Sequence, residues 1–258
     1  MASAIETPMK RVLVTGASRG IGAAVAHHFL EEHWEVALCA RSVSGLQKVA
    51  LAAGLSRGKA RCVPCDLSNR GASDAAMASL LADWSALDGI VLAHALNIAT
   101  PLAGSLADFE RMIETDLTGP LRLLRQLIPA LQPGSRIVLI GSVLGRFGVP
   151  GQHGYCAAKA GLAGLARGLA LDLAPRGITV NCLQPGWVDT DMARAAIDAQ
   201  CGSMGMSAVE ARAFFEAQLP LKRFLTPKEV AGHVRWLFSP AAAGLTGQVL
   251  NHDCGTLA

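Results

Sequence analysis

The alternation of short apolar runs with longer helical patterns, from one end of the chain to the other, most constrains the fold. The apolar runs are continuous and rich in Val, Ile and Leu, which is typical of parallel strands covered on both faces. Seven of them are predicted strands: residues 11–14, 35–39, 60–63, 89–92, 136–140, 178–183 and 248–250. Helical patterns lie at residues 21–32, 43–53, 73–84, 109–131, 155–173 and 227–238. Because such crossovers are right-handed, this order predicts an α/β fold, a doubly wound parallel sheet of about seven strands with helices on both faces.

Length and composition narrow the class of protein. A chain of 258 residues suits one large domain, and we expect that domain at 10–258 after a flexible end at 1–9. Hydrophobic residues make up 51% and charged residues 17%, which indicates extensive buried surface. A net charge of +3 argues against a nucleic-acid partner. No apolar run approaches the ~20 residues that span a bilayer, so no membrane partner is expected.

The cysteines favour a reducing compartment. There are seven, an odd number, and most stand in strand-like segments, which suits buried thiols in a cytoplasmic protein. Cys62 and Cys65 have CxxC spacing. Without a second pair or nearby histidines, no metal site is expected there.

Two of the predicted helices are apolar nearly all the way round. One is the leucine-rich segment 117–131, and the other is the Ala- and Gly-rich segment 157–171. The sheet can cover only one face of each, so the second face needs another cover. A second subunit in a homo-oligomer is the preferred interpretation, and loops of the same chain are the alternative.

A glycine-rich turn, Thr15–Gly22, follows the first predicted strand and opens the first predicted helix. Gly16 allows a tight turn, while Gly20 and Gly22 allow backbone and helix to approach a dinucleotide, whose pyrophosphate would face the helix N-terminus. Its position between strand and helix distinguishes it from a plain glycine turn. The residues expected to bind cofactor here are Gly16, Ser18, Arg19, Gly20, Ile21 and Gly22.

The end of the second strand favours NADP(H) over NAD. NAD sites commonly hold the ribose hydroxyls with an acidic residue here, and this chain has Ala40 followed by Arg41. Together with Arg19, Arg41 suits a 2′-phosphate, although a merely solvated Arg41 is the alternative. Asp66 and Leu67, just past the third strand, are placed at the adenine edge, or Asp66 caps the next helix.

Ser142, Tyr155 and Lys159 are the candidate catalytic residues. Ser142 ends the fifth strand, where a parallel sheet presents its ligand crevice. Tyr155 and Lys159 are one helical turn apart on one face. A free phenol has a pKa of about 10, and a neighbouring ammonium with a charged nicotinamide would lower it, so that Tyr155 exchanges a proton with a carbonyl oxygen. The Ser142 hydroxyl would hold the same oxygen, and Lys159 the nicotinamide ribose.

These motifs resemble the short-chain dehydrogenase/reductases, a family of Rossmann-like single-domain enzymes, over essentially the whole chain. The matching segments are Thr15–Gly22, Asp66–Leu67, Ser142, Tyr155–Lys159, Asn181–Thr190 and Leu245–Gln248. The resemblance implies that Pro185, Gly186, Val188 and Thr190 border the nicotinamide, and that Tyr155 and Lys159 also touch the cofactor. It also implies a homotetramer or dimer built on the two long helices.

Two positions depart from the family pattern. The usual Asn-Asn-Ala-Gly after the fourth strand is replaced by a segment in which backbone atoms of Ala93 and Ala95 are expected to line the cofactor, with His94 packing locally. Asp116 stands where the family places a fourth catalytic residue, an asparagine. We expect Asp116 to stabilise the Lys159 ammonium and to slow or shift the proton relay.

The residues 187–224 form the expected substrate-specificity region, a lid over an apolar substrate, because they are rich in Met and Phe with glycines as hinges. The expected substrate-contacting residues are Ser142, Leu144, His153, Tyr155 and Trp187. The overall pattern is most similar to the 3-oxoacyl-[acyl-carrier-protein] reductases. The expected substrate is thus an apolar ketone or acyl thioester. An acyl carrier protein that bears such a thioester would meet Arg176 and nearby arginines.

The sequence therefore predicts an NADPH-dependent oxidoreductase that reduces a ketone to a secondary alcohol. A free ketone or a specialised biosynthetic intermediate would serve the same chemistry. A cofactor-binding sensor with little turnover is the alternative of another class, motivated by the two departures.

Overall fold

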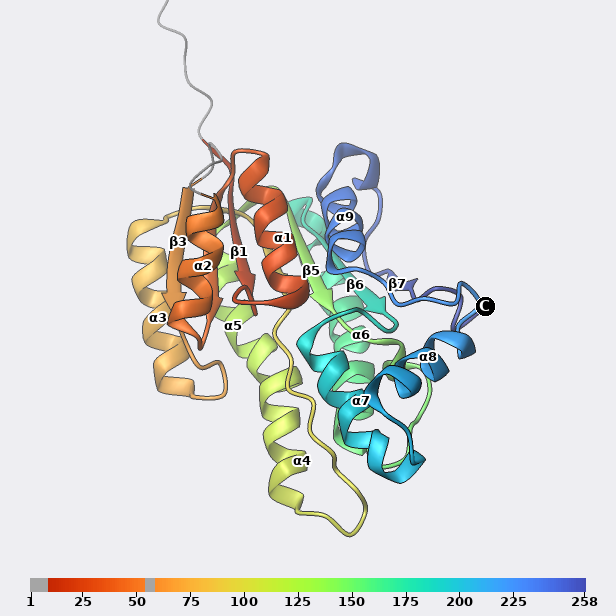
Figure 1. Ribbon diagram of the computed structural model, residues 1–258. Coiled ribbons are helices and arrows are strands. Elements are labelled where there is room, and N and C mark those ends of the chain that lie inside the picture. The colour runs from red at the N-terminus through yellow and green to blue at the C-terminus, as the bar shows by residue number, and fades with distance from the viewer. Residues whose placement is uncertain (1–8, 54–58) are drawn as a thin grey trace, which may run out of the picture.

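The computed structural model describes residues 9–53 and 59–258. Of the end expected to be flexible, residues 1–9, all but Met9 lies outside the described residues. A seven-stranded sheet forms the centre, with strand order β3-β2-β1-β4-β5-β6-β7 (Figure 1). The strands are β1 Arg11–Thr15, β2 Glu35–Ala40, β3 Lys59–Pro64, β4 Leu87–Leu92, β5 Leu131–Ile140, β6 Thr179–Pro185 and β7 Val249–His252.

All neighbouring strands pair in parallel, so every strand ends at the same edge of the sheet. The chain order reverses between β1 and β4, and this reversal creates the crevice in which doubly wound folds bind ligands. The predicted fold class is confirmed, and each expected strand is present.

Helices cover both faces of the sheet, and each face has its own apolar core (Figure 1). One core packs α1 Gly20–Glu31, α2 Val43–Ala53 and α9 Pro227–Phe238 against side chains such as Val14 and Leu38. The other packs α3 Arg70–Asp83, α5 Gly119–Leu127 and α6 His153–Leu173 against Leu13 and Leu139. Successive strand residues face opposite sides, so the continuous apolar runs feed both cores.

The prediction of one continuous helix at 109–131 is wrong, because the segment is divided. It divides into α4 Leu106–Ile113, a π-helical turn Glu114–Thr118, α5, and a short 3-10 turn Ile128–Ala130. The widening occurs next to Pro120, which has no N–H for a regular helical bond. Leu131 belongs to β5, where it pairs with Leu87 before an irregularity in the register.

The specificity region contains two helices that are not predicted from the sequence, α7 Asp191–Met204 and α8 Ala208–Gln218. Local signals for them exist. Thr190 caps α7, Gly205 ends it with a φ of 62°, and Ser207 with Glu210 forms a capping box on α8. Because these helices are of mixed polarity, their apolar periodicity is weak, whereas their capping residues can be recognised in the sequence.

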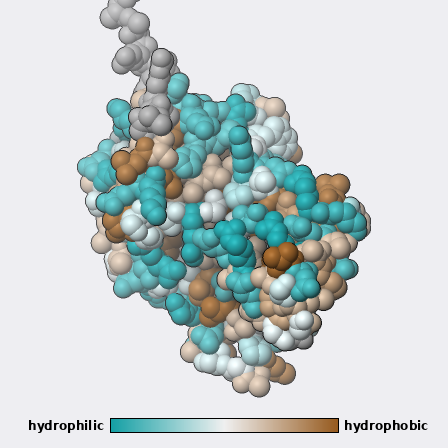
Figure 2. Space-filling view, in the orientation of Figure 1, coloured by the Kyte–Doolittle hydropathy of each residue, from teal (hydrophilic) through white to brown (hydrophobic). Residues whose placement is uncertain are grey.

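The two nearly apolar helices keep exposed apolar side chains in the single chain. Leu121 of α5 is 38% exposed and Leu171 of α6 is 78% exposed, so loops of the same chain do not cover them. Figure 2 shows apolar patches on the α4–α5 helix and over the α7–α8 region within a largely hydrophilic face. Among the described residues, no helix is both long enough and apolar enough to cross a membrane.

Candidate active site

The glycine-rich turn lies at the crevice between β1 and β4. Gly16 has a φ of +66°, and a Cβ there would lie 2.8 Å from the Ala93 carbonyl oxygen. A Cβ on Gly22 would lie 2.3 Å from the Gly16 oxygen, so both positions require glycine. Arg19 caps α1 without a side-chain bond to its first turn, which leaves the helix N–H groups to an anion. The turn therefore fits a pyrophosphate.

The other residues of this turn have separate surroundings. Ser18 packs against α2, where a Cβ on Gly45 would lie 2.8 Å from the Ser18 Cβ. Ile21 is partly buried against the core of the α1 face. A Cβ on Gly20 would lie 3.3 Å from Cγ2 of Thr190, so the turn and the start of α7 are neighbours.

At the other end of the proposed cofactor site, the charges of Arg41 and Asp66 interact. Arg41 is exposed just after β2. Burial raises the pKa of Asp66. Hydrogen bonds from Ser68 and the charge of Arg41 lower this pKa by more than burial raises it, so the net pKa lies below its usual value. Asp66 does not cap α3, because Asn69 accepts the Ala72 N–H at 3.1 Å instead. That alternative is wrong.

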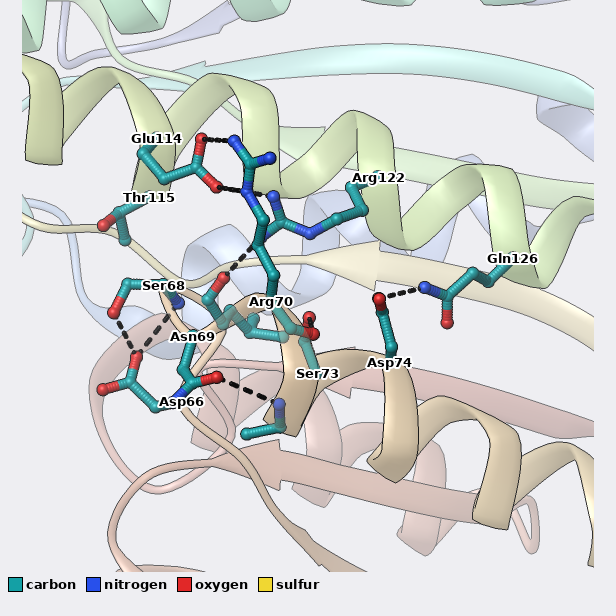
Figure 3. A network of polar contacts seen from close by, with 12 residues as sticks. Asp66, Ser68, Asn69, Arg70, Ser73, Asp74, Glu114, Thr115, Arg122 and Gln126 are labelled. Carbon is teal, nitrogen blue, oxygen red and sulfur yellow. Dashed lines mark hydrogen bonds and ion pairs between the residues drawn. The ribbon is translucent and has the colours of Figure 1, made fainter.

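A polar network ties the turn after β3 to the π-helical turn, as Figure 3 shows. Arg122 donates to the Leu67 carbonyl oxygen at 3.0 Å and to Glu114 Oε1 at 2.5 Å. Arg70, at the start of α3, also pairs with Glu114. The sequence does not reveal this network, because its members are far apart in the chain and match no motif.

Ser142, Tyr155 and Lys159 lie together at the carboxyl edge of the sheet, and all three are buried. Ser142 follows β5, and its Oγ accepts the Leu144 N–H at 3.2 Å. Tyr155 stands in the first turn of α6, and the Ser142 hydroxyl acts to lower the pKa of its phenol. Lys159 Nζ lies 5.3 Å from the centre of the Tyr155 ring.

The electrostatics of the phenol differ from the sequence-based expectation. Burial raises the pKa of Tyr155, and the Asp116 carboxylate adds to this, while Lys159 and the Ser142 hydroxyl lower it. Lys159 thus acts in the expected direction, yet the net pKa is above its usual value. Burial raises the pKa of the phenol more than the Lys159 ammonium lowers it.

Asp116 contacts Lys159 directly from the π-helical turn. Its Oδ2 lies 3.3 Å from Lys159 Nζ, and its Oδ1 accepts the Leu96 N–H at 2.7 Å. Lys159 Nζ also donates to the Ile140 carbonyl oxygen at 3.3 Å. Burial lowers the pKa of Lys159, but Asp116 and Tyr155 raise it more, as expected for the lysine. Burial raises the pKa of Asp116 despite Lys159 and the Leu96 bond.

The segment after β4 lies against the glycine-rich turn. Ala93, His94 and Ala95 are partly buried, and the ring nitrogens of His94 contact Thr15 and the Thr115 carbonyl oxygen. Burial, followed by the charge of Lys159, lowers the pKa of His94 to about 4. The residue is therefore neutral at neutral pH, in line with the packing interpretation.

The remaining predicted residues border the same edge. Pro185 pairs with His252, and a Cβ on Gly186 would lie 2.9 Å from Asp253 Cα. Val188 bridges to Leu225, the residue directly after the specificity region. The substrate candidates lie as follows: Leu144 is partly buried, His153 is exposed with Nδ1 2.6 Å from the Thr100 oxygen, and Trp187 stacks on Phe224 with 5.1 Å between ring centroids.

Arg176 has an internal role rather than a free guanidinium. It donates to the Ile128 carbonyl oxygen at 3.0 Å and to that of Leu131. The Ile128 carbonyl oxygen also accepts the Leu131 N–H, and Leu131 is the first residue of β5. The Arg176 guanidinium, expected to meet a carrier protein, is thus partly buried and bonded to carbonyls of its own chain.

Comparisons with known proteins agree with this geometry. The sequence profile of the family described as enoyl-(acyl carrier protein) reductase matches residues 16–256. The chain is 35% identical over 250 residues to the 3-oxoacyl-[acyl-carrier-protein] reductase FabG of Escherichia coli, covering 95% of this chain and 96% of that protein. The FabG of Vibrio cholerae is 33% identical over 249 residues, with 95% and 96% covered.

Solved structures give the same result. A point variant of the actinorhodin polyketide ketoreductase, solved with NADPH, superposes with a TM-score of 0.89 at 31% identity, covering 96% of this chain and 97% of that one. A dehydrogenase/reductase from Sinorhizobium meliloti reaches 0.86 at 34% identity, with 96% and 95% covered. The chain belongs to the short-chain dehydrogenase/reductase family, and it is an oxidoreductase of that family.

Proposed function

We propose that this protein is an NADP(H)-dependent ketoreductase that reduces a β-keto acyl thioester to a secondary alcohol. The observation that carries the proposal is the convergence of Ser142, Tyr155 and Lys159 at the carboxyl edge of the sheet, the edge at which the glycine-rich turn follows β1. Its relatives named as 3-oxoacyl-[acyl-carrier-protein] reductases support the substrate class. A carrier-bound thioester is preferred to a free ketone or a specialised intermediate on this ground.

Ser142, Tyr155 and Lys159 have separate roles in the proposed reduction. The Ser142 hydroxyl holds the carbonyl oxygen, and the Tyr155 phenol gives that oxygen its proton. The Lys159 ammonium holds the ribose and favours the phenolate left on Tyr155. When bound, the nicotinamide supplies the hydride to the carbonyl carbon.

The preference for NADP(H) rests on charge. Arg41 and Arg19 are exposed, and β2 ends in Ala40 without a carboxylate. The NADPH-bound ketoreductase of the same fold supports this choice. Arg41→Ala should raise the KM for NADPH roughly tenfold to a hundredfold and leave that for NADH unchanged. Lys228→Ala, an exposed cation on α9, is the matched control. Equal loss with both cofactors would contradict the preference.

The decisive experiment follows NADPH absorbance with a panel of β-keto thioesters and small ketones. Turnover that Tyr155→Phe lowers by about 100-fold or more, with NADPH binding retained, supports the enzyme. Tight NADPH binding without consumption across the panel supports a cofactor sensor instead. Faster turnover of free ketones than of thioesters favours the free-ketone alternative.

The same proposal includes a lid, an oligomer and a cytoplasmic location. The lid is the specificity region 187–224, whose aromatic residues Trp187, Phe215 and Phe224 pack together. The oligomer, a tetramer rather than a dimer, would cover the exposed Leu121 and Leu171. Its mass by light scattering tests this, and a monomer would overturn it. The seven free cysteines favour a reducing compartment.

A further inference from the structure

One carbonyl in the π-helical turn has no helical donor. The Gly119 N–H donates to the Glu114 oxygen, five residues back. The next such bond, to the oxygen of Thr115, would need an N–H at residue 120, which is proline. A buried carbonyl without a donor is unfavourable, so the Thr115 oxygen requires a partner from outside the helix.

His94 is that partner. Its Nε2 lies 3.1 Å from the Thr115 oxygen, and its Nδ1 lies 2.7 Å from Thr15 Oγ1. A carbonyl can only accept, so Nε2 carries the proton and Nδ1 accepts the hydroxyl proton of Thr15. Thr15 Oγ1 in turn accepts the N–H groups of Ala93 at 3.1 Å and His94 at 3.3 Å. The neutral imidazole satisfies every one of these contacts.

The charges around His94 keep it neutral. Lys159 of α6 faces it, and the Asp116 carboxylate of the π-helical turn pairs with that same ammonium. Burial is the largest cause of its low pKa, the Lys159 ammonium is the second, and the Thr115 oxygen opposes them. An imidazolium here would stand beside an ammonium, whereas the neutral ring bonds both neighbours.

The His94 ring lies between Thr15, at the start of the glycine-rich turn, and Thr115 of the π-helical turn. Two residues after His94, the Leu96 N–H donates to Asp116 Oδ1, so two bonds join the 93–96 segment to residues 115 and 116. On its other side, this segment packs against Gly16 of the glycine-rich turn. Asp116 reaches Lys159 from this fixed position.

We propose that His94 is a positioning residue, whose neutral ring clamps the 93–96 segment to the π-helical turn and thereby sets Asp116 against Lys159. This inference rests on the proposed function for its kinetic consequences, but not for its structural ones. In this geometry, His94 fixes the position of the 93–96 backbone, which is expected to line the cofactor, relative to Asp116 and Lys159.

The test compares His94→Ala, His94→Asn and His27→Ala in the full chain. Asparagine keeps a donor and an acceptor, and His27 lies on α1 away from the site. We expect His94→Ala to weaken NADPH binding, measured by fluorescence titration, and to lower kcat by about tenfold or more. It should also shift the pH–rate profile. His94→Asn should recover most of the loss, and His27→Ala should match the wild type. If His94→Ala lowers only the Tm, with NADPH affinity, kcat and pH profile unchanged well below that Tm, the role is merely structural and the inference fails.

A readout without substrate separates this inference from the proposed function. Because the folded-state pKa of His94 is about 4 against an ordinary 6.5, the wild type should lose stability as pH falls from 6.5 towards 4. His94→Asn should lack this loss, and an unchanged loss would contradict the clamp. Should His94→Ala fail to fold, Pro120→Ala offers a second route. It restores an N–H at residue 120 that can donate to the Thr115 oxygen, so the double variant with His94→Ala should fold where His94→Ala alone does not. A double variant that also fails to fold would count against the inference.

Discussion

A buried carboxylate and a buried ammonium share the centre of the site. Lys159 is 1% exposed, and Asp116 is equally hidden. Removing one partner of such a pair leaves an uncompensated buried charge, which is strongly unfavourable. Asp116 therefore cannot be regarded as an inert substitute for an amide, because it acts on both Lys159 and Tyr155 through its charge.

Asp116→Asn is expected to move the pH dependence of turnover. The carboxylate contributes to the raised pKa of Tyr155, so its loss should lower that pKa. Alcohol oxidation needs the phenolate, and its rising limb should therefore shift to lower pH. The pH–rate profile in the oxidative direction measures this. Asp108→Asn, at an exposed position of α4, is the control. An unmoved profile in Asp116→Asn would show that the carboxylate does not act on the relay.

At the scale of elements, the π-helical turn gives the site its shape. Gly119 permits the turn, because a Cβ there would lie 2.8 Å from the Glu114 oxygen, a backbone atom that cannot move aside cheaply. Such turns are rare and occur frequently at functional sites. The widened turn carries Asp116 into the core while Glu114 stays in the arginine network of α3 and α5.

Gly119→Ala should consequently destabilise the fold by roughly 1–3 kcal/mol and lower kcat, since the turn must shift to relieve the clash. Gly232→Ala on α9 is the opposite control. Its Cβ would meet nothing within 4 Å, and alanine should stabilise that helix by ~0.5–1 kcal/mol. Denaturant unfolding compares the two. Equal stability changes would mean that the turn tolerates a side chain.

For the molecule as a whole, the sequence predicts what depends on local pattern and misses what depends on tertiary contacts. The continuous apolar runs mark all seven strands, and the glycine-rich turn marks the crevice. The helices α7 and α8 are not predicted from the sequence because they are only partly apolar, although Thr190 and Ser207 are recognisable N-cap residues. The net pKa of Tyr155 could not be foreseen, since burial is a property of the fold.

Acid stability is a further property of the whole fold. Arg223 bonds both carboxylate oxygens of Glu229, which joins the end of the specificity region to the start of α9. The Arg223 bond, then the Thr226 N–H, lowers the pKa of Glu229 to about 2. This contribution is present above the ordinary value of 4.5 and is lost as pH falls from there towards 2. Asp116 acts in the opposite direction, because burial raises its pKa and its protonation at low pH therefore favours the folded state.

We therefore expect Glu229→Gln to lower the Tm at pH 7 and to flatten its decline between pH 4.5 and about 3, while Glu31→Gln, at an exposed position on α1, follows the wild type. Because the Glu229 carboxylate is partly open to solvent, the effect at pH 7 should be small and should shrink in high salt. Thermal unfolding followed by circular dichroism across this range measures it. A Glu229→Gln curve parallel to that of the wild type would mean that the acid sensitivity arises from the buried site, where the pKa of His94 is lowered to about 4.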